Sequence, residues 1–569
     1  MEQTLDALNA SGDSFSTMHL LEESGAEPMG LWKSVLCTIC FLVATYCVSR
    51  MWLNNGKMVF TRAQFQSSYR LRVSVGPPNS ERCRRCLLWA VDEITKSHGS
   101  LQINRSQCQL LSAECQRLTS LCKPRFARQH FVLRELYCAV RNALKLVQDC
   151  CTQNWLLKAV ELGNCQEHFR EVLLDLHRLI IDPTNLGVNP FDGTGIIDET
   201  VVKNMLTASK SDKTELKRKV QSEYGHGHYL ANQLMEEPVS VSAPPEISKH
   251  VTDFSFDKTP IIYSKPGITK DQPDIVVFRV THISKEFIVK MRWSKPRAKL
   301  ECEEPELVWE GPADQRLQSE ANTMKKCRHP YTVGLVGYWE VTIKMVQLLL
   351  MESMECNLKE HLDKRSKSTS FYGLRGGTTG FPASDAISLV LPVAKALRYL
   401  HSTKVVHRDL KPQNILYTHV SGTQHLPDHF SVKLADFGEA LKVEDCVVLS
   451  PSIAGTTEYM DPDVYNRKNI DLYKADVFSF GLVFGEVLTG VSPGEALKCM
   501  SDPLVHGGHS RCVLGSKFQK KLRDGDRPPL PKDTPEFVKN IVKRCCDPDP
   551  AERPSFETIC DDLLKYLRH

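Results

Sequence analysis

Hydrophobic residues recur at helical spacing through residues 80–182. Leu133, Leu136, Val140, Leu144 and Val147 follow one another at intervals of three, four, four and three residues, which places them on one face of a helix. Similar spacing occurs in two further sets: Leu111, Cys115, Leu118, Cys122 and Phe169, Val172, Leu176, Leu179. Amphipathic helices joined by short connections must bury their stripes against one another. We therefore predict a helical bundle over 80–182, with one irregular helical arm as the alternative.

The chain before this region has a different pattern. Residues 1–28 are polar and acidic and show no periodicity, which is typical of disorder. Sixteen uncharged residues then run between Lys33 and Arg50. As a helix they would measure about 24 Å, against a hydrocarbon core of about 30 Å. We expect residues 29–53 to form a transmembrane or membrane-associated helix, a buried core helix being the alternative. The basic residues that follow would leave the rest of the chain in the cytoplasm, anchored by this segment.

The pattern changes again after the predicted bundle. Residues 183–244 are polar and include a basic run from Lys210 to Lys219, so we predict a linker or brace there, with the basic run as a solvated helix face. From about residue 245, short β-type runs such as Phe287–Met291 are mixed with helical stretches. The fold class predicted for the whole chain is α+β, with an α-helical bundle at the N-terminal side.

Composition narrows the class of protein. A chain of 569 residues has room for about three domains, and 41% hydrophobic and 25% charged residues are typical of globular proteins. A net charge of +4 over this length argues against a dedicated nucleic-acid binder. The 21 cysteines are scattered through a long chain, which is against a disulfide framework.

Two short motifs carry the strongest chemical signal. Residues 407–414 read His-Arg-Asp-Leu-Lys-Pro-Gln-Asn, and Asp436-Phe437-Gly438 follows. Phosphoryl transfer needs a base that orients the attacking hydroxyl and oxygen ligands for Mg²⁺, held in fixed relation. Asp409 suits the first role, and Asn414 and Asp436 suit the second. The chain from about residue 245 to its end resembles a two-lobed protein kinase, with an N-lobe over about 245–352 and a C-lobe over about 353–569.

The resemblance implies further residues for ATP binding and catalysis. Lys290 corresponds to the lysine that clamps the α- and β-phosphates, and Glu320 to its ion-pair partner. Met351 would be the gatekeeper beside the adenine pocket, with the backbone of Glu352–Met354 bonding the base. Lys411, two residues after the catalytic aspartate, is similar to the γ-phosphate contact of serine/threonine kinases.

The resemblance also implies regulatory and structural residues. Arg408 suggests control by a phosphate in the activation segment, because a guanidinium pairs bidentately with phosphate. The candidate phosphate acceptors are Ser450, Ser452, Thr456 and Thr457. Asp463 stands where most kinases have glutamate and is expected to pair with Arg553. Asp476 is expected to anchor the backbone of the catalytic loop.

One part of the kinase pattern is missing. The glycine-rich loop is expected about 17 to 22 residues before Lys290, but residues 268–273 contain no glycine. Glycines there normally let backbone N–H groups approach the phosphates closely. We therefore expect weak to moderate ATP affinity.

The helical region resembles one particular family. Residues that carry this likeness are Ile103-Asn104-Arg105-Ser106-Gln107-Cys108, Arg134-Glu135-Leu136-Tyr137, Asn154-Trp155 and Cys165-Gln166-Glu167. They are similar to the plant mixed-lineage-kinase-domain-like proteins, in which a four-helix bundle precedes a kinase-like domain and acts as a membrane-directed effector in immunity. Two functions remain open. One is a serine/threonine kinase that acts on protein substrates. The other is a weakly active or pseudokinase switch that controls a bundle able to form homo-oligomers and to meet membrane lipid.

Overall fold

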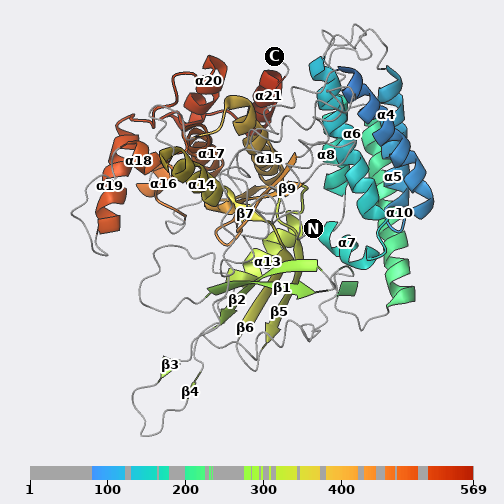
Figure 1. Cartoon of the computed structure of the whole chain (residues 1–569). Helices are drawn as coiled ribbons and strands as arrows, with labels where there is room; N and C mark the ends of the chain where they lie inside the picture. Colours follow the sequence, from blue (N-terminus) through green and yellow to red (C-terminus); the bar gives the residue numbers. More distant parts are fainter. Residues whose placement is uncertain are drawn as a thin grey trace, which may run out of the picture. The chain divides into compact units, whose positions relative to one another are not determined.

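The structure is a computed structural model of the 569-residue chain, shown in Figure 1. It describes residues 80–121, 130–162, 166–178, 199–224, 230–231, 234, 275–282, 285–293, 297–298, 307–308, 316–341, 346–371, 380–420, 429–443, 455–467, 471–497 and 510–567. Several predictions fall outside these residues: disorder over 1–28, the apolar segment 29–53, the window 268–273, and Ser450 and Ser452.

A helical bundle forms the first part of the described chain, as predicted. Its helices are α4 (Ser80–Lys96), α5 (Arg105–Leu121), α6 (His130–Cys150), α7 (Trp155–Leu162) and α8 (Gln166–Arg178), with a 3₁₀ turn at Ser97–Ser100. Helices α4, α5, α6 and α8 pack side by side (Figure 1). The predicted stripe positions Leu136, Val140, Leu144 and Val147 are buried, so this face of α6 packs against the other bundle helices.

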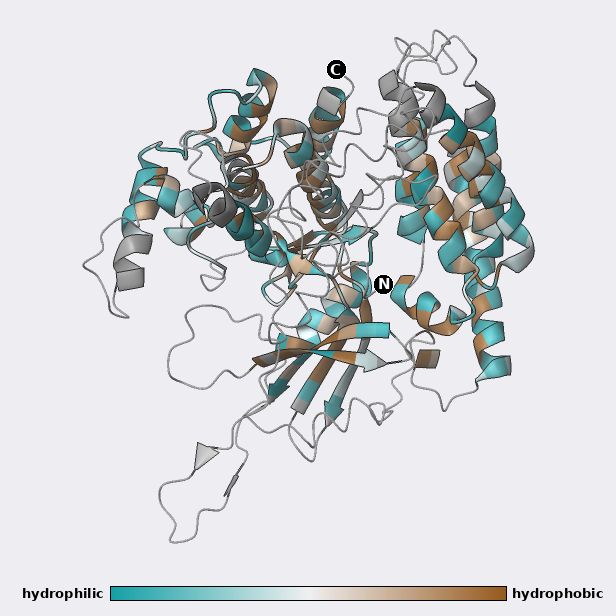
Figure 2. Cartoon of the chain, in the orientation of Figure 1, coloured by the Kyte–Doolittle hydropathy of each residue, from teal (hydrophilic) through white to brown (hydrophobic). Residues whose placement is uncertain are grey.

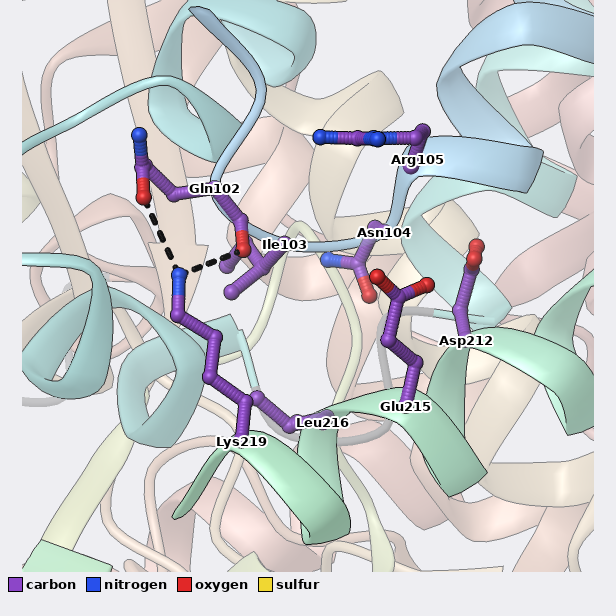
Figure 3. Close-up of a pocket in the computed structure, with 8 residues that line it drawn as sticks. All are labelled: Gln102, Ile103, Asn104, Arg105, Asp212, Glu215, Leu216 and Lys219. Carbon is purple, nitrogen blue, oxygen red and sulfur yellow. Dashed lines mark hydrogen bonds between the residues drawn. The ribbon is translucent and has the colours of Figure 1, made fainter. Parts of the chain in front are cut away.

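A long helix lies within the stretch predicted as linker or brace. Helix α10 (Glu199–Glu223) packs against α5 and α8. Its Asp212 carboxylate accepts the N–H groups of Ser106 and Gln107, both at 2.9 Å, and so caps the N-terminus of α5. The Lys219 ammonium donates to the backbone oxygen of Gln102 at 3.1 Å and to its side-chain oxygen at 3.0 Å (Figure 3). These contacts make α10 a brace on the bundle.

An antiparallel sheet follows, with strand order β1-β2-β6-β5. The strands are β1 (Ile275–His282), β2 (Lys285–Trp293), β5 (Leu335–Val341) and β6 (Val346–Glu352), and helix α13 (Arg316–Lys326) packs on β5 and β6. Side chains alternate between the two faces of a strand. Strands β2 and β6 carry consecutive hydrophobic residues, Phe287–Val289 and Leu348–Met351, and hydrophobic stretches are brown along the sheet in Figure 2, so both faces of the sheet are apolar. Leu349 belongs to the core that contains α13, whereas Leu348 and Leu350 belong to a core shared with the bundle helices.

The second lobe is mostly helical. Its helices are α14 (Leu358–Phe371), α15 (Ala383–Ser402), α16 (Pro462–Tyr465), α17 (Leu472–Thr489), α18 (Pro493–Ala496), α19 (Ser510–Arg523), α20 (Glu536–Cys545) and α21 (Phe556–Leu567), with 3₁₀ turns at Pro412–Asn414 and Pro550–Glu552. The short strands are β7 (Cys356–Asn357), β8 (Val405–Val406), β9 (Ile415–Val420), β10 (His429–Leu434) and β11 (Leu441–Lys442); β3 (Arg297–Ala298) and β4 (Leu307–Val308) form a separate pair. The predicted α+β class, with a helical bundle followed by two lobes, is confirmed.

The predicted membrane anchor needs a correction. Among the helices that the structure describes, none is both long enough and apolar enough to cross a bilayer. These helices therefore give no support to the predicted N-terminal anchor, and its segment 29–53 lies outside the described residues. The domain limits 80–182, 183–244 and 245–569 remain predictions.

Candidate active site

A partly buried ion cluster joins strand β2, helix α13 and the loop after β10. The Lys290 ammonium lies 2.9 and 2.7 Å from the two carboxylate oxygens of Glu320 and 3.0 Å from Asp436 Oδ1. Burial alone would lower the pKa of Lys290, but the two carboxylates outweigh that effect, so the pKa lies above its ordinary value. Lys290 therefore stays charged, and its ammonium donates to three carboxylate oxygens.

Asp436 is held by an unusual backbone conformation and by the packing of its neighbours. Its φ is +63°, in the left-handed region that non-glycine residues visit rarely. The next side chain, Phe437, is buried in the core, and its ring lies 5.5 Å from the ring of His407. A Cβ on Gly438 would lie 3.4 Å from Asp436 Oδ1 and 3.5 Å from Glu320 Oε2. These are ordinary van der Waals distances, so the Gly438 backbone lies directly beside the ion cluster.

The loop before β9 gathers a second polar cluster around Asp409. Lys411 Nζ lies 2.5 Å from Asp409 Oδ2, and both side chains are buried. The Asn414 side-chain N–H₂ donates to the backbone oxygen of Asp409 at 2.8 Å and to Oδ2 at 3.1 Å. This loop therefore presents a carboxylate, an ammonium and an amide in one fixed arrangement.

Thr456 joins this cluster from the activation segment. Its N–H and its hydroxyl both donate to Asp409 Oδ1 at 2.8 Å, and the hydroxyl accepts from Lys411 Nζ at 2.7 Å. The approach requires Gly455, whose φ is +104° and whose position would put a Cβ only 2.4 Å from the Arg408 carbonyl oxygen. We predicted Thr456 as a phosphate acceptor, but its hydroxyl already lies between the base and the lysine. The prediction missed this role because it depends on a contact between segments 47 residues apart.

Asp476 on α17 holds the backbone of the same loop. It accepts the N–H of His407 at 2.8 Å and the N–H of Arg408 at 2.9 Å, and it lies 3.0 Å from His401 Nε2. Burial would raise the pKa of Asp476, but His401 and these N–H groups outweigh it, so the pKa lies below its ordinary value. The buried carboxylate stays ionised and fixes the φ of +67° at Arg408.

The strand predicted to carry the adenine-binding residues is β6, which ends at Glu352. Met351 is partly buried beside the core, and Met354 is buried. The Glu352 N–H donates to the Gly334 carbonyl at 3.0 Å, so that group serves the fold and not the base. Its carboxylate accepts from Gly334 N at 2.5 Å and from Lys433 Nζ at 2.6 Å. Sequence reasoning did not detect this side-chain role of Glu352.

The carboxylate predicted to pair with Arg553 is the wrong one. The Arg553 guanidinium pairs with Asp461 and not with Asp463, and both members of the pair are buried. Pro462 begins α16, so Asp461 is the residue before the helix, and its carboxylate also accepts the Asp463 N–H at 2.8 Å. Asp463 lies in the first turn of the helix, where an acidic side chain favours the helix dipole.

The donor set fits the groups that kinase chemistry needs. Asp436 and Asn414 offer carboxylate and amide oxygens, the ligands that Mg²⁺ prefers, and the Asn414 N–H₂ is turned toward Asp409 so that its oxygen remains as the acceptor. Thr457, also predicted as a phosphate acceptor, uses its carbonyl to accept from Gln519 Nε2 at 2.7 Å.

The pocket in Figure 3 lies between α10 and the start of α5 and contains none of the residues assigned to phosphotransfer.

Comparison with known proteins agrees with this geometry. Residues 276–564, about half of the chain, match the family model of the protein kinase domain. The chain belongs to the protein kinase family. This chain is 31% identical over 179 residues to a probable LIM domain-containing serine/threonine-protein kinase of Dictyostelium discoideum, and the match covers 32% of this chain and 16% of that protein. It is 28% identical over 292 residues to serine/threonine-protein kinase STY17 of Arabidopsis thaliana, over 51% of this chain and 42% of that protein. The chain therefore spans less than half the length of these two relatives.

A solved structure extends the likeness beyond the kinase lobes. The cryo-electron-microscopy structure of the AtMLKL3 tetramer matches this chain with a TM-score of 0.56 at 20% identity, over 85% of this chain and 89% of that chain. At this identity the likeness concerns the fold. It confirms the predicted resemblance, in which a helical bundle precedes a kinase fold.

Proposed function

We propose that this chain is an ATP- and Mg²⁺-dependent protein kinase that phosphorylates serine and threonine hydroxyls of protein substrates. The observation that supports the proposal is the Lys290–Glu320–Asp436 ion cluster, with separations of 2.7 to 3.0 Å. These three residues come from β2, α13 and the loop after β10, so the cluster forms only when both lobes are in register.

Each polar residue of the site has its own role in the proposed phosphoryl transfer. Lys290 binds phosphate oxygens of the nucleotide, and Glu320 keeps its ammonium in place. Asp409 accepts the proton of the attacking hydroxyl and orients that oxygen. Lys411 lies against Asp409 and offers positive charge where negative charge grows in the transition state. Mg²⁺, bound by Asn414 and Asp436, would neutralise charge on the phosphates.

The preference for serine and threonine rests on Lys411 and Thr456. The two side chains are in contact at 2.7 Å, and both lie beside the Asp409 carboxylate. A short aliphatic hydroxyl can approach the carboxylate there, which supports a serine/threonine substrate class. The curated relatives named above carry serine/threonine kinase in their names.

Labelled ATP tests the proposal directly. Purified full-length protein is incubated with Mg²⁺ and γ-labelled ATP, and the labelled amino acids are identified by mass spectrometry. We expect label on serine or threonine and none in the Asp436→Asn variant, which keeps the size of the side chain but loses its charge. Equal labelling of the two proteins, or none in the wild type, would show that the proposal is wrong.

A kinase-like switch that controls an oligomerising bundle is the second candidate. The observation that favours it is the hydrophobic core that bundle helices share with strands β2, β5 and β6, because a change at the nucleotide site could reach the bundle through it. Sedimentation velocity with and without ATP and Mg²⁺ tests this candidate. A nucleotide-dependent change of oligomeric state without phosphotransfer would favour the switch, and phosphotransfer at constant oligomeric state would favour the enzyme.

A further inference from the structure

Residues 327–334, which join α13 to β5, lie between the proposed active site and the bundle; we call them the linking segment. The segment is internally fixed by Thr332, whose hydroxyl donates to the Cys327 carbonyl at 3.0 Å and accepts the His329 N–H at 3.0 Å. Cys327, His329 and Thr332 are buried. A segment this tightly bonded moves as one body.

On its inner side, the linking segment touches three parts of the proposed active site. It continues directly from α13, which carries Glu320. Val333 N–H donates to the Leu434 carbonyl at 2.9 Å, and Leu434 N–H donates to the Tyr331 carbonyl at 2.8 Å, two residues before Asp436. Gly334 exchanges bonds with Glu352 at the end of β6. A shift of the segment would therefore move Glu320, Asp436 and the adenine-binding strand together.

On its outer side, the linking segment is held by the C-terminus of α7. The Arg328 guanidinium donates to the carbonyl oxygens of Val160 and Glu161, the latter at 3.3 Å. These carbonyls belong to the last turn of α7, where a cation favours both the unpaired oxygens and the helix dipole. The Glu161 carboxylate pairs with Lys285 on β2. Helix α7 thus contacts both the linking segment and the start of β2.

Helix α8 adds a buried charge cluster. Glu171 is 4% exposed, and its carboxylate lies 2.7 Å from Arg398 Nη2, 3.3 Å from Lys395 Nζ and 3.5 Å from His329 Nε2. Asp175, one turn further along α8, pairs with Lys395. His329 also stacks on Tyr399 of α15 with ring centroids 4.9 Å apart. Breaking one member of a buried ion cluster leaves the others uncompensated. Glu171 thus ties α8 to α15 and, through His329, to the linking segment.

We propose that α7 and α8 are positioning elements of the phosphotransfer site: through the linking segment, the bundle holds α13 where Glu320 meets Lys290. In this arrangement, Glu171 and Arg328 are positioning residues that touch neither nucleotide nor substrate. The importance of the arrangement for catalysis rests on the proposed function, but the coupling between bundle and α13 does not.

Hydrogen exchange of the full-length protein tests the coupling without relying on activity. Glu171→Gln removes the charge that faces Arg398, Lys395 and His329, and we expect the amides of residues 316–326 to exchange about 5- to 150-fold faster, the range typical of coupled sites. Arg170→Gln is the matched control. Arg170 is the preceding residue of α8, and its exposed guanidinium pairs with Glu167 on the same helix. We expect exchange in this control to equal that of the wild type.

The pattern of exchange distinguishes the coupling from a general loss of stability. Faster exchange at 316–326 with unchanged exchange in α17 supports the coupling. Unchanged exchange at 316–326, or equal acceleration in α13 and α17, would overturn it. If Glu171→Gln does not fold, Arg328→Gln decides by the same criteria. Where the wild type transfers phosphate, Glu171→Gln should also raise the KM for ATP, because Lys290 loses its partner. Absence of phosphotransfer in the wild type would refute the proposed function and leave the exchange result to judge the coupling.

Discussion

Replacing Thr456 by valine should slow phosphotransfer about 30-fold without unfolding the protein. Valine keeps the shape of threonine but removes the hydroxyl that donates to Asp409 at 2.8 Å and accepts from Lys411 at 2.7 Å. A hydrogen bond to a charged group contributes about 1.5–3 kcal/mol. Asp409 keeps the Thr456 N–H and Lys411, so neither charge is isolated and we expect the lower part of that range, about 2 kcal/mol. If the loss falls on the transition state, the rate drops about 30-fold.

Single-turnover kinetics at saturating ATP measure this effect. Thr456→Ser is the matched control, because it restores the hydroxyl without the methyl group, and its rate should stay within about 3-fold of the wild type. Thermal melting of all three proteins checks that they are folded. Full activity of Thr456→Val would refute the reasoning, and so would an equal loss in Thr456→Ser, which would assign the effect to the methyl group. We also expect mass spectrometry to find no phosphate on Thr456 in the active protein.

Three further substitutions test other parts of the site. Glu320→Gln should raise the KM for ATP about 10-fold or more in steady-state kinetics, since a neutral amide holds the Lys290 ammonium less strongly; an unchanged KM would contradict the ion-pair role. Asp461→Asn should lower the free energy of unfolding by about 3 kcal/mol in urea titrations, because it leaves Arg553 buried without its carboxylate. Asp463→Asn should lower it by less than about 1 kcal/mol. A larger loss in Asp463→Asn than in Asp461→Asn would restore the pairing expected from sequence. The Asp476 carboxylate has a lowered pKa, so its stabilisation is complete above its unfolded pKa of about 4 and disappears as the pH falls through the lower native value. Melting curves should therefore show Asp476→Asn strongly destabilised at pH 7 and close to the wild type near pH 2, and a pH-independent difference would count against this linkage.

The parts of the site that sequence could predict are those carried by contiguous motifs. Asp409, Lys411 and Asn414 share one loop, and their order along it dictates their relative placement. The pair Lys290 and Glu320 also follows from local elements, a β-type run and a helix at a fixed offset before His329. The bundle was predictable for a similar reason, because the helical period alone identifies which residues of each helix must be buried.

The parts that sequence could not predict depend on contacts between distant segments. Glu171 meets Arg398 across 227 positions, and nothing in the local pattern around either residue selects the other. The choice of Asp461 over Asp463 depends on where α16 begins, and helix ends are the least reliable boundaries in sequence. The capping of α5 by Asp212 is likewise invisible until α10 is seen to pack there.

The two-faced sheet has a consequence for how this chain is made. Phe287 and Val289 of β2 complete a core with the bundle helices, yet the bundle ends at residue 178 and β6 ends at residue 352. At synthesis rates of about 5–20 residues per second, the interval between these two points is on the order of ten to thirty seconds. During that time the nascent bundle exposes an apolar face that only later strands will cover. Newly made chains should therefore depend on chaperones most strongly in this interval, and the segment that folds as a unit crosses the boundary between the two domains.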